Sequence, residues 1–371
     1  MRVVVLGGGA IGASTAFRLA ERGADVVLVE CHAVAGAASG KSGGFLALDW
    51  CDGTPLEALA RRSFALHADL ADALGGQEWG YRRMTTFAGT IGRSESRLPL
   101  ASMPGWVGDG VAIRQRIGTP GSTAQVHPAR FTAAMMRAAE THGAVLRMGR
   151  ATGLACRGER VYGVQLEGET LLADRVVIAM GPWSALTSEW LPMPPVYGLK
   201  GHSLLFETGS LLSAEAFFLE YADSVGVTIT PEVFPRADGT TYACGVSSES
   251  PVPVDPARVA PDRGALDRLT ALCARISPVL ARSPIVASGA FYRPVTGDGL
   301  PLIGPIGGVD GAFVATGHSV WGILNAPATG EAMAELVLDG TARAVDLSPF
   351  HPARFGGLGR ERVAIARRVG R

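Results

Sequence analysis

The first thirty residues contain the pattern that most constrains the fold of this chain. Residues 3–6 are a continuous apolar run, VVVL, of the length expected for a buried strand. The spacing G-x-G-x-x-G follows at Gly7, Gly9 and Gly12. Residues 10–23 then have apolar side chains at near-helical spacing, and a second apolar run, residues 24–30, ends in Glu30. The sequence therefore predicts a strand, a glycine turn, a helix and a second strand.

This unit is typical of proteins that bind a dinucleotide. The glycines let the backbone approach a pyrophosphate, and the helix N-terminus offers unpaired N–H groups to its charge. Glu30 can accept a hydrogen bond from a ribose hydroxyl. Because glycine is abundant, with 49 residues in the chain, a chance glycine turn is the alternative. The complete unit favours dinucleotide binding, but it does not distinguish NAD from FAD.

The loop after this unit, residues 35–45, reads AGAASGKSGGF. Its residues are small and rich in donors, so we predict a flexible loop whose backbone follows an extended ligand. An NAD domain would usually continue through regular βα units here, so the loop favours FAD. The alternative is a disordered Gly/Ser linker. The position of the loop directly after Glu30 favours the ligand loop.

Composition and charge argue against several classes of partner. Lys plus Arg and Asp plus Glu both total 34, so nothing points to a nucleic acid or an anionic membrane surface. The five cysteines form no C-x-x-C pair and have no nearby histidine at metal-ligand spacing, so we expect neither a metal site nor a disulfide framework. No apolar run reaches membrane-spanning length. We therefore expect a soluble protein of the reducing cytoplasm with a small ligand.

The rest of the chain suggests two interlocked domains. Residues 55–74 and 128–143 have helical periodicity and end at glycines, whereas residues 81–92 have strand-like composition. From about residue 196 to residue 290 the chain reads as strands and turns, with one helix at 266–276. This order predicts an antiparallel sheet laid over an α/β domain.

The order of several motifs resembles that of the D-amino acid oxidase and glycine oxidase superfamily of FAD-dependent oxidoreductases. The motifs are the glycine turn, Glu30, ASGKSGGF, YRRMTTFAG, RVVIAMGPWS, RPVTGDGLPLIG and GHSVWGILNAPATG, and they span nearly the whole chain. The most specific part is residues 293–304, which are similar to the superfamily pattern R-P-x-T-x-D-G-x-P-x-I-G. The variants SGKSGGF and WGILN resemble a poorly characterised subgroup.

The resemblance implies an α/β chain, α+β overall. It would combine a Rossmann-like FAD/NAD(P)-binding domain of the glutathione-reductase type with an antiparallel-sheet substrate domain. The implied ranges are 1–80, 125–195 and 287–371 for the FAD-binding domain, and 81–124 and 196–286 for the substrate-binding domain. Superfamily members with covalent flavin use a cysteine near the C-terminal flavin motif. This chain has none after Cys273, so noncovalent FAD is expected.

The resemblance also implies which residues hold FAD. The ADP half would be held by Gly7, Gly9, Ala10, Ile11, Gly12 and Glu30. The residues that run along the pyrophosphate and flavin would be Ser39, Gly40, Lys41, Ser42, Gly43, Gly44 and Phe45. The remaining cofactor contacts would be Gly181, Trp183, Arg293, Gly317, His318, Trp321, Gly322, Ile323 and Leu324.

The segment GHSVWGILNAPATG predicts a strand that ends at Gly317, a tight turn through His318 and Trp321, and a helix that begins near Gly322. The N–H groups and positive dipole end of this helix would face the flavin and stabilise its anionic reduced form. The backbone of His318 would then matter more than its imidazole.

The superfamily's chemistry implies the reaction. An amine substrate loses a hydride from its α-carbon to flavin N5, water hydrolyses the imine, and dioxygen reoxidises the flavin to give peroxide. We therefore expect oxidation of the CH–NH bond of a small amine or amino acid. Arg293 would bind the substrate carboxylate through two parallel hydrogen bonds. The alternative is a structural arginine that pairs with a neighbouring carboxylate such as Asp298.

Other candidate catalytic residues carry alternatives of their own. Tyr292, Tyr221 and His202 are candidate pocket walls, as are Trp50 and Trp321, and ordinary packing is the alternative for each. The Lys41 ammonium could stabilise the charge that develops when oxygen accepts an electron, or it could pair with the pyrophosphate. Lys200, near the entry to the predicted substrate sheet, could play either role or neither.

Two other functions are alternatives to an amine or amino acid oxidase. An FAD-dependent 2-hydroxy acid dehydrogenase would share the fold and the carboxylate-binding arginine but pass electrons to a quinone or a carrier protein. A flavin-containing interaction protein with low turnover is the other.

Overall fold

The N-terminal unit forms as predicted in the computed structural model, which describes residues 1–92, 104–223 and 226–356. Strand β1 (Arg2–Leu6) leads through the glycine turn into helix α1 (Ala10–Glu21), and strand β2 (Asp25–Glu30) returns beside β1 in parallel register. Gly23, at φ 82°, allows the sharp reversal between helix and strand.

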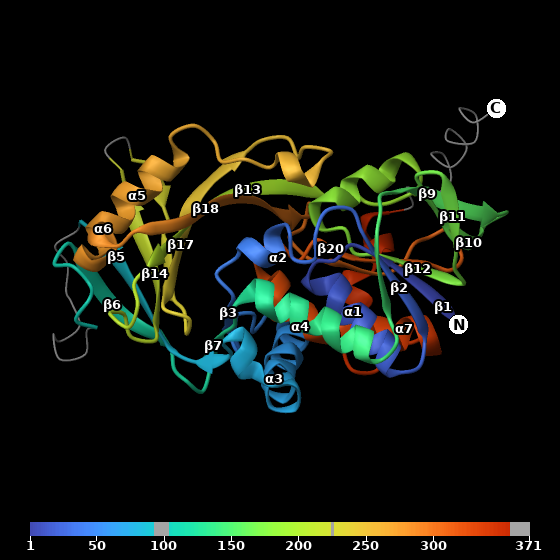
Figure 1. Ribbon diagram of the computed structural model, residues 1–371, viewed down its shortest axis with the longest axis horizontal. Helices are drawn as coiled ribbons and strands as arrows, with labels where there is room; N and C mark the ends of the chain where they lie inside the picture. Colours follow the sequence, from blue (N-terminus) through green and yellow to red (C-terminus); the bar gives the residue numbers. More distant parts are fainter. Residues whose placement is uncertain (93–103, 224–225, 357–371) are drawn as a thin grey trace.

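A six-stranded sheet grows around this unit in the order β19-β20-β12-β1-β2-β8. Its pairs are parallel except for β19 with β20. The other four strands are β8 (Val145–Met148), β12 (Arg175–Ile178), β19 (Leu302–Pro305) and β20 (Ala312–Thr316). Helices α1, α4 (Pro128–Thr141) and α7 (Gly322–Asp339) pack together on one face of the sheet (Figure 1).

The alternation of side chains along β1 explains both layers. Val3 and Val5 belong to the core beneath the helices, whereas Val4 and Leu6 pack on the opposite face. That face is covered by a three-stranded sheet in the order β11-β10-β9. Its strands are β9 (Ala151–Arg157), β10 (Arg160–Leu166) and β11 (Glu169–Leu172). Because both faces are covered, the run VVVL is fully buried.

The second large sheet lies at the other end of the long axis (Figure 1). Its order is β18-β13-β17-β16-β14-β5-β6, with β15 paired to β14. The bounds are β5 (Thr85–Ile91), β6 (Val111–Gly118), β13 (Tyr197–Glu207), β14 (Glu215–Ala222), β15 (Thr228–Ile229), β16 (Glu232–Pro235), β17 (Thr240–Glu249) and β18 (Ile285–Val295). The sheet is antiparallel as expected except between β5 and β14, which are parallel.

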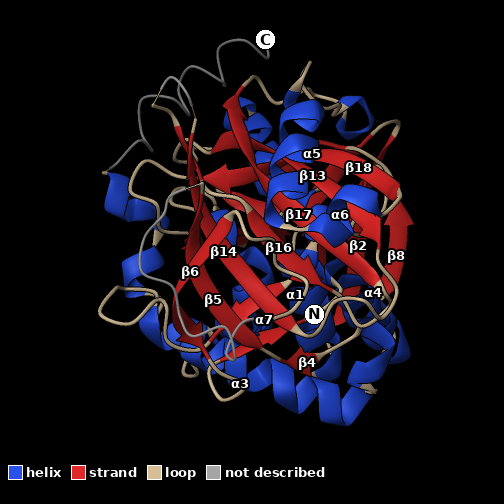
Figure 2. Ribbon diagram, turned by 90° about the vertical axis from the view of Figure 1, so that its left-hand side faces the viewer, coloured by secondary structure: helices blue, strands red, loops and turns tan. Residues whose placement is uncertain are grey.

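Helix α5 (Ala265–Ile276) packs on β13 and β17, where Figure 2 shows it in front of the sheet together with α6 (Pro278–Arg282). It begins one residue before the predicted helical segment and ends with it at Ile276. The sheet continues past residue 287, because β18 pairs with β13 along its length. The domain ranges themselves stay a prediction, and residues 357–371 of the last range lie outside the described part of the chain.

The remaining elements connect the two sheets. A small sheet, β3-β7-β4, consists of β3 (Phe45–Ala47), β4 (Arg82–Arg83) and β7 (Thr123–Gln125). Helix α3 (Glu57–Leu74) ends at Gly75, and α4 is followed by Gly143, both close to the predicted ends. The 3₁₀ helices are η1 (Gly76–Trp79), η3 (Gly181–Glu189), η4 (Pro256–Arg258), η5 (Ser319–Trp321), η6 (Ser348–Phe350) and η7 (Pro352–Phe355). Within the described residues, no helix is both long and apolar enough to cross a bilayer.

The loop at 35–45 differs from its prediction. Residues Ala38–Lys41 form a short helix, α2, rather than flexible coil. Two side chains hold its end: the hydroxyl of Tyr242, on β17, donates to the Lys41 carbonyl at 2.9 Å, and Nη2 of Arg236, in the turn between β16 and β17, donates to the Ser42 carbonyl at 2.9 Å. These bonds exclude the disordered linker.

Candidate active site

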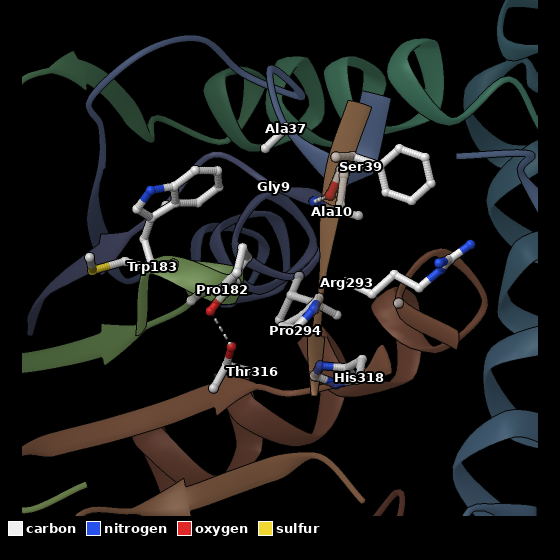
Figure 3. A pocket seen from close by; sticks show the side chains of 18 of the residues that line it. Gly9, Ala10, Ala37, Ser39, Pro182, Trp183, Arg293, Pro294, Thr316 and His318 are labelled. Carbon is white, nitrogen blue, oxygen red and sulfur yellow. Dashed lines mark hydrogen bonds between the residues drawn. The ribbon is translucent and has the colours of Figure 1, made fainter. Parts of the chain in front are cut away.

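A cavity of about 560 Å³ is lined by residues from both large sheets. The parallel sheet contributes its glycine turn and the segments after β2, β12 and β20, all at the carboxyl ends of strands. Ligands of open α/β sheets bind at this edge. The eight-stranded sheet contributes residues of β14, β16, β17 and β18. Figure 3 shows Ser39, Trp183, Arg293 and His318, which come from distant parts of the sequence, gathered around this cavity.

The glycine turn is packed too tightly for side chains at two positions. A Cβ on Gly12 would lie 1.9 Å from the Gly7 carbonyl oxygen, and one on Gly7 would lie 2.4 Å from the Ala179 carbonyl oxygen. Helix α1 begins after Gly9 with no side-chain cap from that residue and no acidic residue in its first turn. The Ala10 N–H instead donates to Ser39 Oγ at 2.9 Å. The positive end of the helix therefore faces the cavity without a carboxylate of its own.

Glu30 organises the adjoining backbone. Its Oε2 accepts from the Gly8 N–H and its Oε1 from the His32 N–H, both at 2.7 Å. The carboxylate also lines the cavity at the end of β2. Glu30 thus stabilises the turn and the chain after β2, while part of it stays open to a ligand.

The N-terminus of α7 forms another positive end at the cavity. β20 stops at Thr316, Gly317 takes φ 80°, and η5 leads into the helix at Gly322. The helix has no side-chain cap and no acidic residue in its first turn. Gly322 and Ile323 line the cavity, so unpaired N–H groups of this end are available there. The turn and helix match the sequence prediction closely.

His318 lines the cavity but is only 3 % exposed. Its Nε2 lies 3.1 Å from Thr329 Oγ1, and its Nδ1 has no hydrogen-bond partner. Burial lowers the pKa of His318 to about 3, so the imidazole is neutral at ordinary pH. The neutral His318 ring, hydrogen-bonded to Thr329 of α7, can therefore hold the turn in place without adding a charge to the cavity.

Arg293 on β18 is the cation that the eight-stranded sheet presents to the cavity. Its Nη1 donates to Ser247 Oγ at 3.2 Å, and its guanidinium lies 5.1 Å from the centre of the Phe291 ring. No carboxylate within the described residues forms an ion pair with it. The expected alternative, a pair with Asp298, is wrong, because Asp298 pairs with Arg354 at 2.7 Å. The Arg293 guanidinium keeps donors for a ligand.

Aromatic rings form part of the cavity wall. Phe45 and Trp50 contact Phe218 and one another, and Phe45 stacks on Phe234, with centroid distances of 4.8–5.6 Å. Trp321 meets Trp50 edge-on at 6.3 Å. Trp50 and Trp321 are therefore pocket walls, as proposed from the sequence.

Most of the predicted cofactor residues come together at this cavity. Those that line it are Gly7, Gly9, Ala10, Ile11, Glu30, Ser39, Ser42, Gly43, Gly44, Phe45, Gly181, Trp183, Arg293, His318, Trp321, Gly322 and Ile323. Those that do not are Gly12, Gly40, Lys41, Gly317 and Leu324. Gly12 and Gly317 shape the two turns instead, and Leu324 belongs to the core beneath α7.

The structure corrects the assignment of three candidate pocket walls. The Tyr292 hydroxyl donates to the Pro251 carbonyl at 2.8 Å. His202 is fully buried, with Nδ1 bonded to the Val246 carbonyl and Nε2 accepting from the Asp262 N–H. Tyr221 packs on the core covered by α5. None of the three lines the cavity. Each projects from the face of the eight-stranded sheet that is turned away from the cavity.

Both lysines also lie outside the cavity lining. Lys41 Nζ donates to the Ala290 carbonyl at 3.3 Å, and burial lowers its pKa. Lys200 is buried and bonded to Asp262. Neither ammonium therefore faces the space in which a cofactor would lie, which corrects the role suggested for Lys41.

The sequence did not reveal several residues that the sheet turns into the cavity. They are Phe218, Glu232, Phe234, Tyr242, Cys244 and Phe291. Glu232 lies opposite Cys244, and Phe234 lies opposite Tyr242, in the register of β16 and β17. These residues alternate along their strands with Val233 and Ala243, which pack under α5. That period-two alternation was the sequence signal that could have identified the cavity-facing positions.

A family model of FAD dependent oxidoreductases, DAO, matches residues 2–336. The chain belongs to this family. Among its relatives, an oxidoreductase of Schizosaccharomyces pombe is 28% identical and is aligned over 94% of this chain and 97% of its own. The glycine oxidase of Pseudomonas aeruginosa is 29% identical over 95% of this chain and 98% of its own.

Solved structures of the family share the architecture. The crystal structure of glycine oxidase from Geobacillus kaustophilus superposes with a TM-score of 0.79. It is 25% identical and covers 95% of this chain and 99% of its own. This likeness confirms the mixed α/β fold expected from the sequence.

FAD is the cofactor expected for this family, and the residues present fit it. The N-termini of α1 and α7 face the cavity, and neither has an acidic residue in its first turn, which suits a pyrophosphate and an anionic flavin. The Ser42 hydroxyl is buried without a partner and lines the same space. Glu30 lines the cavity at the end of β2, and its carboxylate would accept a hydrogen bond from a ribose hydroxyl there. In the described part of the chain no cluster of side chains could hold a metal ion.

Proposed function

We propose that the protein oxidises the CH–NH bond of a small amine or amino acid. FAD, when bound, would accept a hydride from the substrate α-carbon and be reoxidised by dioxygen to give hydrogen peroxide, and water would hydrolyse the imine. The single observation that carries the proposal is Arg293, a guanidinium without a carboxylate partner in the described residues, in the same cavity as the dinucleotide turn.

Arg293 would hold the substrate carboxylate. A guanidinium offers two parallel donors to one carboxylate and so fixes its orientation as well as its position. The bond to Ser247 and the ring of Phe291 hold the guanidinium in place before the substrate arrives. Such preorganisation lowers the cost of binding and keeps the α-carbon in one orientation.

The aromatic wall would exclude water from the reacting carbon. Phe45, Trp50 and Phe218 touch one another and bring apolar surface to the cavity. A dry wall strengthens the interaction between Arg293 and a carboxylate, because fewer water molecules compete for it.

We further propose that FAD is bound noncovalently and that the reaction takes place in the cytoplasm. Cys31 and Cys244 line the cavity, but burial raises the pKa of both thiols, which disfavours the nucleophilic thiolate. All five cysteines are free, as in a reducing compartment. Release of FAD by acid precipitation would test the first point; flavin that stays with the protein would contradict it.

The test is anaerobic bleaching of the flavin in the purified holoprotein. We would add D- and L-amino acids, N-methyl amino acids and 2-hydroxy acids, and then follow reoxidation in air by stopped flow. Bleaching by an amine followed by fast reoxidation supports an oxidase. Bleaching by hydroxy acids alone, with very slow reoxidation, would assign the 2-hydroxy acid dehydrogenase instead. No bleaching across the panel would favour the low-turnover interaction protein.

The substitution Arg293→Lys tests the residue itself. A lysine keeps the charge but loses the paired donors, and one hydrogen bond to a charged group contributes about 1.5–3 kcal/mol. We expect KM for the bleaching substrate to rise about tenfold or more, with FAD content unchanged. Arg116→Lys, at an exposed position on β6 of the same sheet, is the matched control. An Arg293→Lys enzyme with the KM of this control would contradict the assignment.

A further inference from the structure

Glu232 is an acidic side chain that the described reaction has not yet used. It begins β16 and lies between β14 and β17 in the eight-stranded sheet. The next residue, Val233, packs under α5, so the Glu232 side chain points to the opposite face and lines the cavity. Glu232 and Arg293 are the two charged residues that this sheet contributes to the cavity lining in the described residues.

The carboxylate of Glu232 has little to balance its charge. Among the described residues its hydrogen-bond donor is the Cys244 thiol, at 3.5 Å, and a thiol is a weak donor. No Arg, Lys or His nitrogen in those residues lies within 4.0 Å of it. Burial raises the pKa of Glu232, and the charge of Arg293 opposes this rise. A carboxylate in such a place is costly unless a cation reaches it.

Both charged groups line the cavity, but in the described residues they form no ion pair with each other. Arg293 is directed to Ser247 and lies over Phe291, while Glu232 is directed to Cys244. Gly201 makes room for this arrangement, because a Cβ there would lie 3.0 Å from Arg293 Nη1. A ligand that reaches both residues from the cavity would meet a cation at Arg293 and an anion at Glu232.

An amino acid has matching charges on adjacent groups, since its carboxylate and its ammonium are attached to the same α-carbon. A 2-hydroxy acid has the carboxylate but no cation, so it would leave Glu232 without a counter-ion. A site that leaves a buried charge unpaired discriminates strongly against that ligand.

We propose that Glu232 is the counter-ion for the amino group of the substrate whose carboxylate Arg293 binds, and that it makes the cavity select amino acids over 2-hydroxy acids. This inference rests on the proposed function, in which Arg293 holds the carboxylate. Glu232 is here a specificity-determining residue that acts through binding.

The test uses two ligands that differ only in the group that Glu232 would contact. 2-Aminoisobutyrate and 2-hydroxyisobutyrate have no α-hydrogen, so neither can lose a hydride from that carbon. Each is titrated into the FAD-loaded protein, and Kd is taken from the change in flavin absorbance. Wild type should bind the amino compound at least tenfold more tightly. In Glu232→Gln the Kd of the amino compound should rise at least tenfold, whereas the Kd of the hydroxy compound should stay the same or fall, because no buried charge is then left unpaired.

Controls separate charge from folding. Glu220→Gln removes an exposed carboxylate from β14 of the same sheet and should leave both Kd values unchanged. Glu232→Asp keeps the charge and should retain the preference for the amino compound with weaker binding. FAD content measured on each variant reports whether the cavity has formed.

The outcomes distinguish failure of the role proposed for Glu232 from failure of the proposed function, in which Arg293 binds the carboxylate. A Glu232→Gln protein that keeps the wild-type preference, or a wild type that has none, overturns the role of Glu232 alone. If Arg293→Lys leaves both Kd values unchanged, or if wild type binds neither compound, the proposed carboxylate site fails and this inference fails with it.

Discussion

The substitution Gly12→Ala tests whether close packing of the glycine turn controls both stability and FAD binding. A Cβ on Gly12 would lie 1.9 Å from the Gly7 carbonyl oxygen, about 1.5 Å inside ordinary contact distance. It would also meet the Ala179 Cβ at 3.4 Å. The clash is with backbone, which cannot rotate away as a flexible side chain can. Helix α1 must therefore move away from β1, or the turn must open.

The expected magnitudes follow from this displacement. Overpacking of a close contact costs about 1–3 kcal/mol. For a chain of this length that corresponds to a fall in Tm of about 1–4 °C if unfolding is cooperative. A shift of the N–H groups after Gly9 would lose at least one hydrogen bond to the pyrophosphate, worth about 1.5–3 kcal/mol. The Kd for FAD should therefore rise about tenfold or more.

Thermal unfolding of the apoprotein by circular dichroism and titration with FAD measure the two effects separately. Gly307→Ala is the matched control, because a Cβ there has no atom within 4 Å and the residue does not have a positive φ. A Gly12→Ala protein with the Tm and FAD affinity of this control would refute the packing argument.

Three further outcomes are expected. Gly322→Val, at the first residue of α7, should reduce FAD retention, whereas His318→Ala should keep FAD because the backbone carries the contact; equal FAD content in both would contradict this. Burial lowers the pKa of His67 to about 4, below its ordinary 6.5. Between these values the unfolded chain binds more protons than the folded one, so the free energy of unfolding falls by about 1.4 kcal/mol per pH unit as the pH drops from 6.5 towards 4. Urea unfolding of His67→Gln should show a shallower dependence, and an unchanged slope would count against it. The Arg354 guanidinium, with smaller contributions from the Leu300 N–H and the Thr296 hydroxyl, lowers the pKa of Asp298 to about 2. The resulting stability is present above pH 3.8 and is lost towards pH 2, and Arg354→Gln should reduce that loss in the urea midpoint.

The sequence predicted those parts of the site that local backbone chemistry determines. The turn from Gly7 to Gly12, the acidic end of β2 at Glu30 and the helix that begins at Gly322 form as expected. In each case the ligand would meet backbone N–H groups or a side chain at a strand end. Spacing along the chain is sufficient to place such groups.

The residues of the eight-stranded sheet could not be predicted in the same way. Tyr292 and Arg293 are adjacent in β18 and were both expected at the substrate, but successive side chains of a strand point to opposite faces. Of these two residues Arg293 lines the cavity and Tyr292 does not, because the Tyr292 hydroxyl is bonded to the Pro251 carbonyl on the other face of the strand. The face that each strand presents depends on register and bulges, such as the shift between Gly201 and Ser203, which no local pattern reveals.

Lys41 shows that helical phase can matter as much as strand phase. Ser39, within α2, and Ser42, which directly follows the helix with extended backbone, both line the cavity. Lys41 lies between them in sequence but projects elsewhere, and its ammonium reaches the Ala290 carbonyl on β18. A flexible loop would have left the ammonium free to face the flavin. Because residues Ala38–Lys41 are helical and their end is held by Tyr242 and Arg236, the side chain instead joins the loop to the strand that carries Arg293. Lys41 therefore links the cofactor loop to the proposed substrate site through β18.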